Sequence, residues 1–212
     1  MTARPLLRYA LMAIVAFALG LFLARVFVTP RKVPVTESAT ILPQPRALPA
    51  LDLVDQDNHP LPRDFLRDRW TLVFFGFTQC PDVCPTTLTT LSQMKKRLAD
   101  LPAGQQPRVL LVSVDPERDT PAILKPYVTF FDPSFLGATG TLAATTQAAT
   151  AFSVPFAKVP LPGGGYTLDH GAGLFVVSPA GALAAYSSPP LDATVLARDY
   201  RKVVQYFEDS HR

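Results

Sequence analysis

The sequence has few cysteines and no large excess of basic residues over acidic ones. It contains two cysteines in 212 residues, and a local pair of this kind is not a disulfide framework. Its charge is also close to balanced, with a formal net charge of +3. Three of the basic residues, Arg4, Arg8 and Arg25, lie in or beside one N-terminal segment, so the rest of the chain is about neutral. The sequence therefore lacks the clustered basic face that nucleic-acid binding needs.

The one long apolar run lies at the N-terminus. Residues 9–24 carry no charge, and the run reaches the roughly 20 residues that a spanning helix needs if Arg25 snorkels and residues 26–28 are counted. A cleaved signal peptide is the competing interpretation, because basic residues precede the run and alanines lie near its end. The length of the run favours an uncleaved anchor over residues 1–28. Either interpretation exports the rest of the chain.

Prolines separate this segment from the rest of the chain. Residues 29–49 contain five prolines and few large apolar residues, which predicts an extended, semi-rigid spacer. The domain itself is predicted over residues 50–208, followed by a short tail over 209–212. We expect this domain to face the periplasm from the cell inner membrane, or the mitochondrial intermembrane space in a eukaryote.

Both cysteines lie at the junction of a strand and a helix. Residues 71–77 are almost wholly apolar and rich in β-branched and aromatic side chains, which is typical of a strand buried on both faces. Cys80 and Cys84 follow, and Pro85 stands where a first helical residue is expected. Apolar residues then recur at spacings of three and four, which indicates an amphipathic helix. The dipole and free N–H groups at the start of this helix favour a thiolate.

The remaining elements alternate in a way that predicts an α/β sheet. A short β-hairpin is expected over residues 51–61, a second buried strand over 108–115, and a helix that starts at Pro121 and is capped by Asp119 or Thr120. Further elements are a strand, a helix, a hairpin with a glycine tip, a second hairpin and a final helix, over residues 135–138, 141–152, 154–170, 173–186 and 192–207. This order is that of a thioredoxin-like fold with an N-terminal β-hairpin extension and a β-hairpin insertion.

The spacing of the cysteines allows two kinds of chemistry. A redox dithiol in this fold normally has two residues between its cysteines, whereas three separate Cys80 from Cys84. The larger loop still allows a disulfide, but it also suits two sulfurs that converge on one metal. Two thiolates are too few for a structural zinc site, whereas copper accepts two or three soft ligands. A third ligand is therefore sought among the histidines.

Of the three histidines, only one is placed to reach the thiols. His59 follows a polar turn and is expected to be a solvated loop residue, and His211 belongs to the C-terminal tail. His170 stands between the glycine-tipped hairpin and a buried strand, which in a thioredoxin-like sheet begins near the helix that carries the cysteines. From the pattern alone, His170 is either a metal ligand or an ordinary loop histidine.

Three motifs together resemble one known family. F-F-G-F-T-Q-C-P-D-V-C-P, V-D-P-E-R-D-T-P and L-D-H before an apolar strand are similar, in type and order, to motifs of the Sco/SenC copper-binding proteins. The resemblance covers about residues 50–208 together with the tethered N-terminus. It implies that Cys80, Cys84 and His170 are copper ligands. It also implies a membrane-anchored, thioredoxin-like metallochaperone that helps to assemble the dinuclear copper centre in subunit II of cytochrome c oxidase.

The chemistry of the residues agrees with this resemblance but leaves two functions open. Two thiolates and one imidazole suit Cu(I) and also tolerate Cu(II). Asp82 and Asp169 are either solvated or orient a neighbouring ligand. Asp115, Arg118 and Asp119 follow a strand end, where they either serve the site or cap a helix and form a local ion pair. The first function is copper delivery without turnover. The alternative is a thiol–disulfide oxidoreductase that uses Cys80 and Cys84 to reduce the cysteines of the target copper site.

Overall fold

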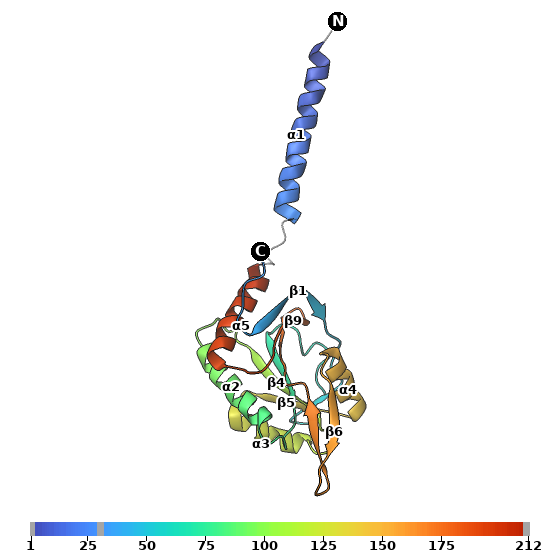
Figure 1. The fold of residues 1–212 in the computed structure, drawn as a ribbon, viewed down its shortest axis with the longest axis vertical. Coiled ribbons are helices and arrows are strands. Elements are labelled where there is room, and N and C mark those ends of the chain that lie inside the picture. Colours follow the sequence, from blue (N-terminus) through green and yellow to red (C-terminus); the bar gives the residue numbers. More distant parts are fainter. Residues whose placement is uncertain (1–2, 29–31, 210–212) are drawn as a thin grey trace. The chain divides into compact units, whose positions relative to one another are not determined.

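The strand predicted before the cysteines forms the centre of the fold. Figure 1 shows the computed structural model, which describes residues 3–28 and 32–209. β3 (Thr71–Gly76) is buried along its whole length, as its apolar run predicts. Its side chains alternate between the two faces of the sheet, so Phe75 packs against Phe152 while Phe74 points the other way, toward His170. His211 lies outside the described residues.

β3 belongs to a mixed sheet of seven strands in the order β1-β9-β8-β3-β4-β5-β2. β3, β4 and β5 run parallel, and the remaining strands pair antiparallel to their neighbours. The other strands are β1 (Ala39–Ala47), β2 (Val54–Asp55), β4 (Arg108–Ser113), β5 (Leu136–Thr139), β8 (Leu174–Val177) and β9 (Ala182–Ser187). The α/β fold predicted from the element order is confirmed.

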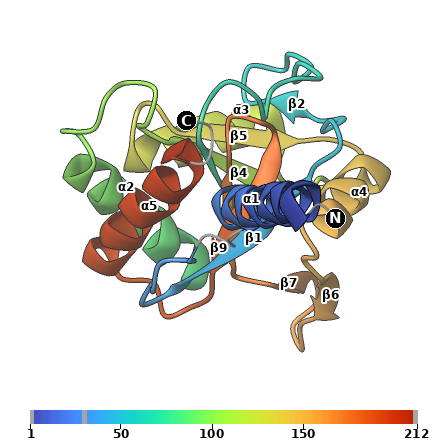
Figure 2. The same cartoon turned by 90° about the horizontal axis from the view of Figure 1, so that it is seen from above.

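Four helices cover this sheet on both faces. α2, α3 and α5 pack together on one face, and α4 covers the other (Figures 1 and 2). Their bounds are α2 (Val83–Arg97), α3 (Pro121–Phe131), α4 (Leu142–Ala151) and α5 (Ala193–Glu208). Each helix lies within two residues of its predicted position, because its apolar spacing and its N-terminal proline or capping residue mark it in the sequence.

The glycine-tipped hairpin also forms. β6 (Phe156–Pro160) pairs antiparallel with β7 (Tyr166–His170) in a separate two-stranded sheet. Gly164 and Gly165 have positive φ angles of 88° and 77°, which glycine adopts without strain. The hairpin projects from the domain in Figure 1, and its second strand ends at His170, immediately before the buried strand β8.

One prediction about the start of the domain is wrong. Residues 39–47, assigned to the spacer, form β1 at the edge of the sheet, and a register shift between Ile41 and Arg46 accommodates the prolines there. The hairpin predicted over residues 51–61 is present in short form, because Val54 bridges Pro60 antiparallel and the N–H of Leu61 donates to the carbonyl of Leu53 over 2.8 Å. Its first arm also forms β2, which pairs with β5 at the opposite edge from β1. Pairing with the distant strand β9, rather than any local signal, determines the structure of residues 39–47.

The chain divides into two compact units, Met1–Val33 and Pro34–Arg212. The first unit contains α1 (Ala3–Val28). Among residues 3–28 and 32–209, no helix has both the length and the apolar character needed to cross a membrane. The anchor over residues 1–28 stays a prediction.

A buried carboxylate fixes the entry to β1. Asp199 on α5 is 1% exposed, and its Oδ2 atom accepts hydrogen bonds from the backbone N–H groups of Glu37, Ser38 and Ala39 at 3.0, 2.7 and 3.0 Å. Burial raises the pKa of Asp199, but these hydrogen bonds outweigh it and hold the pKa below its usual value. The contribution of Asp199 to stability is therefore present at neutral pH and is lost as the pH falls through this lowered pKa.

We expect Asp199→Ala to lower the free energy of unfolding by about 2–4 kcal/mol, because it leaves several backbone N–H groups without their charged acceptor. Urea unfolding of the variant and the parent measures this loss. Asp100→Ala is the matched control, since that carboxylate is exposed and pairs only at the surface with Arg201. An Asp199→Ala loss no larger than that of the control would contradict this assignment.

Candidate metal centre

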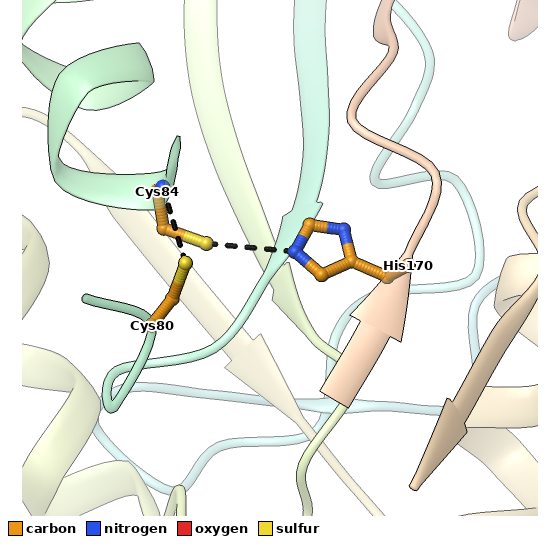
Figure 3. A group of neighbouring side chains, drawn as sticks. All are labelled: Cys80, Cys84 and His170. Atoms are coloured by element: carbon orange, nitrogen blue, oxygen red, sulfur yellow. Dashed lines mark hydrogen bonds between the residues drawn. The ribbon is translucent and has the colours of Figure 1, made fainter. Parts of the chain in front are cut away.

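The loop between β3 and α2 brings the two sulfurs to one end of the sheet. α2 begins at Val83, two residues before the predicted start, so Cys84 lies in the first turn and Cys80 lies in the preceding loop. The N–H of Cys84 donates to the Sγ atom of Cys80 over 3.4 Å (Figure 3). Cys80 thus satisfies one of the free N–H groups at the helix N-terminus. Both cysteines are free thiols.

His170 completes the group from the other side. Its Nε2 atom lies 3.6 Å from the Sγ atom of Cys84, and its Nδ1 atom lies 3.2 Å from the carbonyl oxygen of Gly171 (Figure 3). The imidazole packs edge-on against the rings of Phe74 and Phe77, at centroid distances of 6.3 and 5.8 Å. These contacts fix the ring orientation and leave Nε2 directed at the sulfurs.

Together these residues make a compact set of soft donors. Ligand atoms of Cys80, Cys84 and His170 all lie within 4.8 Å of one another, although residues 84 and 170 are far apart in sequence. Cys80 and His170 are half-buried, and Cys84 is buried. Two sulfurs and one imidazole nitrogen at this separation match the donor set that selects copper over hard cations. The juxtaposition predicted for the three residues is present in the structure.

Burial sets the protonation of two of the three donors. It raises the pKa of the Cys84 thiol well above its ordinary value, and the nearby N–H of Phe77 only partly opposes this effect. It lowers the pKa of His170, because the imidazolium form loses hydration. At neutral pH, His170 is therefore a neutral imidazole with a free lone pair, whereas Cys84 must lose a proton to become a ligand.

One residue of the site had no predicted role. A Cβ atom added to Gly76, at the end of β3, would lie 2.9 Å from Cys84 Sγ and 2.9 Å from a ring atom of Phe74. Glycine is required there because the buried thiol packs directly on the strand. The available signal was the glycine itself, since glycine within a β-branched and aromatic strand often marks a close approach by another group.

Gly76→Ala should displace the Cys84 thiol and overpack the core. We expect a loss of about 1–3 kcal/mol in the free energy of unfolding, together with weaker Cu(I) binding. Urea unfolding and Cu(I) titration measure the two effects. Gly104→Ala is the matched control, because a Cβ atom there meets nothing within 4 Å. Unchanged copper binding in Gly76→Ala would show that the close packing of Cys84 on β3 is not needed.

The two predicted orienting carboxylates lie at the edge of the group. Asp82 is exposed at the N-cap position of α2, and its carboxylate accepts a hydrogen bond from the Thr86 hydroxyl over 3.3 Å. Asp169 is exposed and precedes His170 in β7, so the two side chains point to opposite faces of that strand. Instead, the Gly171 carbonyl contacts the second ring nitrogen of His170. The orienting role of both carboxylates stays a prediction.

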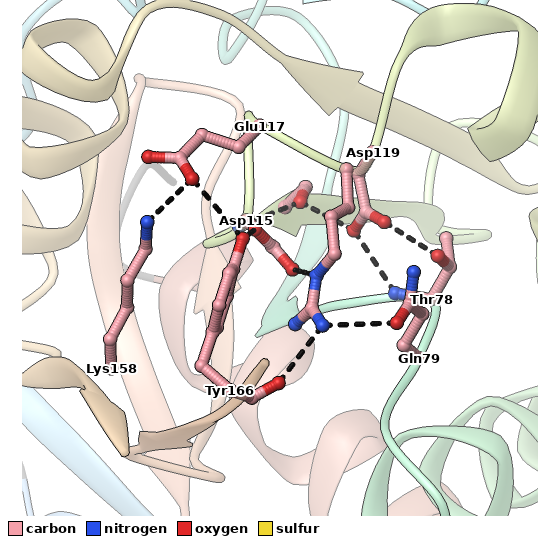
Figure 4. Close-up of polar contacts among 9 residues, drawn as sticks. Thr78, Gln79, Asp115, Glu117, Asp119, Lys158 and Tyr166 are labelled. Atoms are coloured by element: carbon pink, nitrogen blue, oxygen red, sulfur yellow. Dashed lines mark hydrogen bonds and ion pairs between the residues drawn. The ribbon is translucent and has the colours of Figure 1, made fainter. Parts of the chain in front are cut away.

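The segment after β4 lies beside the thiol loop. The predicted ion pair between Asp115 and Arg118 forms (Figure 4). Thr120 is the N-cap residue of α3, one of the two predicted, although its side chain makes no capping hydrogen bond, and Asp119 is used elsewhere. Asp119 accepts hydrogen bonds from the N–H and hydroxyl of Thr78, at 3.0 and 2.5 Å, and so supports the strand end before Cys80.

His59, with its side chain 76% exposed, is the solvated turn residue that the sequence predicts.

Comparison with known proteins agrees with this architecture. The family model described as SCO1/SenC matches residues 42–205. A protein of Stutzerimonas stutzeri is 39% identical over 160 residues, covering 74% of this chain and 77% of the relative. The bovine "Protein SCO2 homolog, mitochondrial" is 34% identical over 142 residues; the match covers 66% of this chain but only 53% of that relative.

A solved structure extends the comparison to three dimensions. The structure of Bradyrhizobium japonicum ScoI with copper bound is 32% identical, with a TM-score of 0.66, over 74% of this chain and 99% of that one. Over the matched part, this chain has the same thioredoxin-like Sco fold. The family model, the sequence relatives and the fold therefore agree, and the chain belongs to the SCO1/SenC family.

Proposed function

We propose that the chain binds one copper ion through Cys80, Cys84 and His170 and delivers it during assembly of the copper centre of cytochrome c oxidase subunit II. The observation that carries this proposal is the convergence of two sulfurs and one imidazole within 4.8 Å. The copper-bound Bradyrhizobium japonicum relative supports the choice of metal. Copper is here the cargo of the protein, so the chain has no catalytic turnover in this function.

The donor set favours Cu(I). Thiolates are soft ligands, and three soft or intermediate donors satisfy Cu(I), whereas a structural zinc site uses four protein ligands. Neutral imidazole with thiolates also tolerates Cu(II). The half-buried Cys80 and His170 leave part of the group accessible to a partner, while the buried Cys84 holds it against the strand. This arrangement suits a carrier that both binds copper tightly and releases it to another site.

Membrane attachment is part of the same proposal. The uncharged run over residues 9–24 supports an anchor in the cell inner membrane, and the mitochondrial name of the bovine relative supports the equivalent compartment. The domain would then face the periplasm or the intermembrane space, where subunit II exposes its copper site. Retention in the membrane fraction after alkaline extraction supports the anchor; release of the intact chain contradicts it.

Replacement of His170 in cells tests copper delivery. A strain that depends on this protein should assemble little active oxidase when it carries His170→Ala, because the variant lacks the imidazole ligand. His59→Ala is the matched control, since that histidine lies in an exposed turn. Full oxidase assembly by His170→Ala would count against delivery of copper by this site.

One observation favours a second function. Cys80 is accessible and its sulfur accepts an N–H at a helix N-terminus, which suits a nucleophilic thiol that reduces the cysteines of a target copper site. Against this function, Cys84 is buried with a raised pKa, and a dithiol reductase does not use a histidine ligand. Normal reduction of a target disulfide by His170→Ala, with oxidase assembly intact, would favour the oxidoreductase.

A further inference from the structure

Arg118 joins three segments that the sequence keeps far apart. Its Nε atom donates to the carboxylate of Asp115, at the end of β4. Its Nη1 atom donates to the Gln79 side chain over 3.0 Å and to the backbone oxygen of Tyr166 over 2.9 Å (Figure 4). Gln79 immediately precedes Cys80, and Tyr166 begins β7, the strand that ends at His170. One guanidinium thus contacts both segments that supply the copper ligands.

The hairpin is held to Arg118 by more than one contact. The guanidinium of Arg118 stacks on the Tyr166 ring at 3.9 Å from its centroid, and the Tyr166 hydroxyl donates to the Asp115 carboxylate over 2.8 Å. Lys158 of β6 pairs with Glu117 at 2.6 Å and lies 4.4 Å from the centre of the same ring. These contacts tie the end of the hairpin next to the glycine turn to the loop after β4, while most of β6 is exposed.

Strand β7 connects Tyr166, which contacts Arg118, to the proposed copper ligand His170. Tyr166 and His170 are four residues apart in one strand, so their side chains point to the same face and lie about 13 Å apart. A shift of Tyr166 therefore moves His170 with it. At the other side of the site, Arg118 holds Gln79, and Asp119 holds Thr78 at 3.0 Å.

Burial makes these contacts specific to arginine. The Asp115 side chain is 1% exposed, so its carboxylate needs a charged partner. Arginine presents several donors in one plane and can serve Asp115, Gln79 and Tyr166 together, while its face stacks on the tyrosine ring. Lysine could pair with Asp115, but its single ammonium group could not keep this arrangement.

We propose that Arg118 is a positioning residue that sets the distance between the His170 imidazole and the Cys84 sulfur, and so sets the contribution of His170 to copper affinity. It contacts no metal ligand side chain and acts through Tyr166 and Gln79. This inference rests on the proposed copper-binding function. It assigns Arg118 of the D-P-E-R-D-T-P motif a role beyond the ion pair with Asp115 that the sequence predicts.

A double-mutant cycle in the 212-residue chain tests the inference. Cu(I) affinity is measured by anaerobic competition for the parent, Arg118→Met, His170→Ala and the double variant. We expect Arg118→Met to weaken Cu(I) binding by about 10–100-fold in the parent, the usual effect of a residue that orients a metal ligand, but by less than about threefold when His170 is already alanine. Equal losses in the two backgrounds, or no loss in the parent, would overturn the inference.

Three further variants separate positioning from folding. Arg118→Met could leave the Asp115 carboxylate buried without its partner, so Asp115→Asn combined with Arg118→Met is measured in parallel and should show the same selective loss. Arg118→Lys should not restore affinity, because charge alone does not position the hairpin; full restoration would overturn the inference. Arg201→Met removes a surface ion pair with Asp100, beyond the C-terminal end of α2, and should leave copper affinity unchanged.

A copper-free measurement distinguishes this inference from the proposed function. The ¹⁵N resonances of the His170 ring and the amide resonances of β7 are recorded for the apo parent and for Arg118→Met. We expect shifts that extend from Tyr166 to His170 in the variant. Unchanged His170 resonances would overturn the positioning role, even if the parent binds copper. If Arg118→Met shifts these resonances but the parent fails to bind copper, the positioning role is supported and only the proposed function is contradicted.

Discussion

Cys84→Ser should abolish tight Cu(I) binding. Serine keeps the size of the side chain but replaces a soft sulfur with a hard hydroxyl that stays protonated, so the set falls from three ligands to two. Removal of a residue that hydrogen-bonds to a metal ligand already lowers metal affinity by about 10–100-fold. We therefore expect removal of the ligand itself to lower Cu(I) affinity by more than about 100-fold. An anaerobic competition titration against a Cu(I) chelator measures the change.

Cys80→Ser provides the parallel test, and it should weaken binding to a similar degree. Cys80 is half-buried, so its replacement disturbs the core less than the replacement of the buried Cys84. Thr86→Ser, in the same helical turn but exposed, is the control for a small change beside the site. Stoichiometric tight binding by either cysteine variant would refute the proposed ligand set.

Copper affinity should increase steeply with pH. Burial raises the pKa of Cys84, so this thiol is protonated at neutral pH and must release a proton when it binds copper. Each unit of pH then strengthens binding by up to about tenfold through Cys84 alone, as long as the pH stays below the raised pKa. Burial lowers the pKa of His170, so protons compete with copper for the imidazole only in more acidic solution.

Titrations between pH 6 and pH 9, with ionic strength held constant, measure this slope. His170→Ala should keep the dependence above neutral pH, because the proton in question comes from the thiol. A parent affinity that does not change with pH would contradict the protonated, buried state of Cys84.

Much of the fold could be predicted because its central elements carry local signals. The apolar run of β3 and the spacing of apolar residues in α2 indicate their own structures, and the order of strands and helices then restricts the topology. The hairpin that ends at His170 was also readable, since three consecutive glycines mark its tip.

The errors lie where a distant partner determines the structure. Residues 39–47 contain Pro43 and Pro45 and read as a spacer, yet they form an edge strand because β9 pairs with them and Asp199 accepts hydrogen bonds from the N–H groups of residues 37–39. Proline is tolerated at an edge, where one side of the strand makes no ladder bonds. Nothing near residue 40 indicates a partner 160 residues away.

The site was predictable to different degrees. The cysteine pair was evident from its spacing at a strand–helix junction. His170 could be interpreted as a metal ligand or as an ordinary loop histidine until the family resemblance assigned it as a ligand. A glycine within an apolar strand was the only sequence signal for Gly76, and it did not identify the contact with Cys84 Sγ. The contacts of Arg118 with Gln79 and Tyr166 could not be predicted from the sequence, because only the folded chain creates them.

The central claim is that two sulfurs and one imidazole bind a single copper ion. An anaerobic Cu(I) competition titration of the reduced chain beside His170→Ala tests it most directly. We predict one copper per chain, bound tightly by the parent and at least about tenfold more weakly by His170→Ala. Weak binding by the parent, or an affinity that does not change when His170 is replaced, would contradict the claim and transfer the function to the redox chemistry of Cys80 and Cys84.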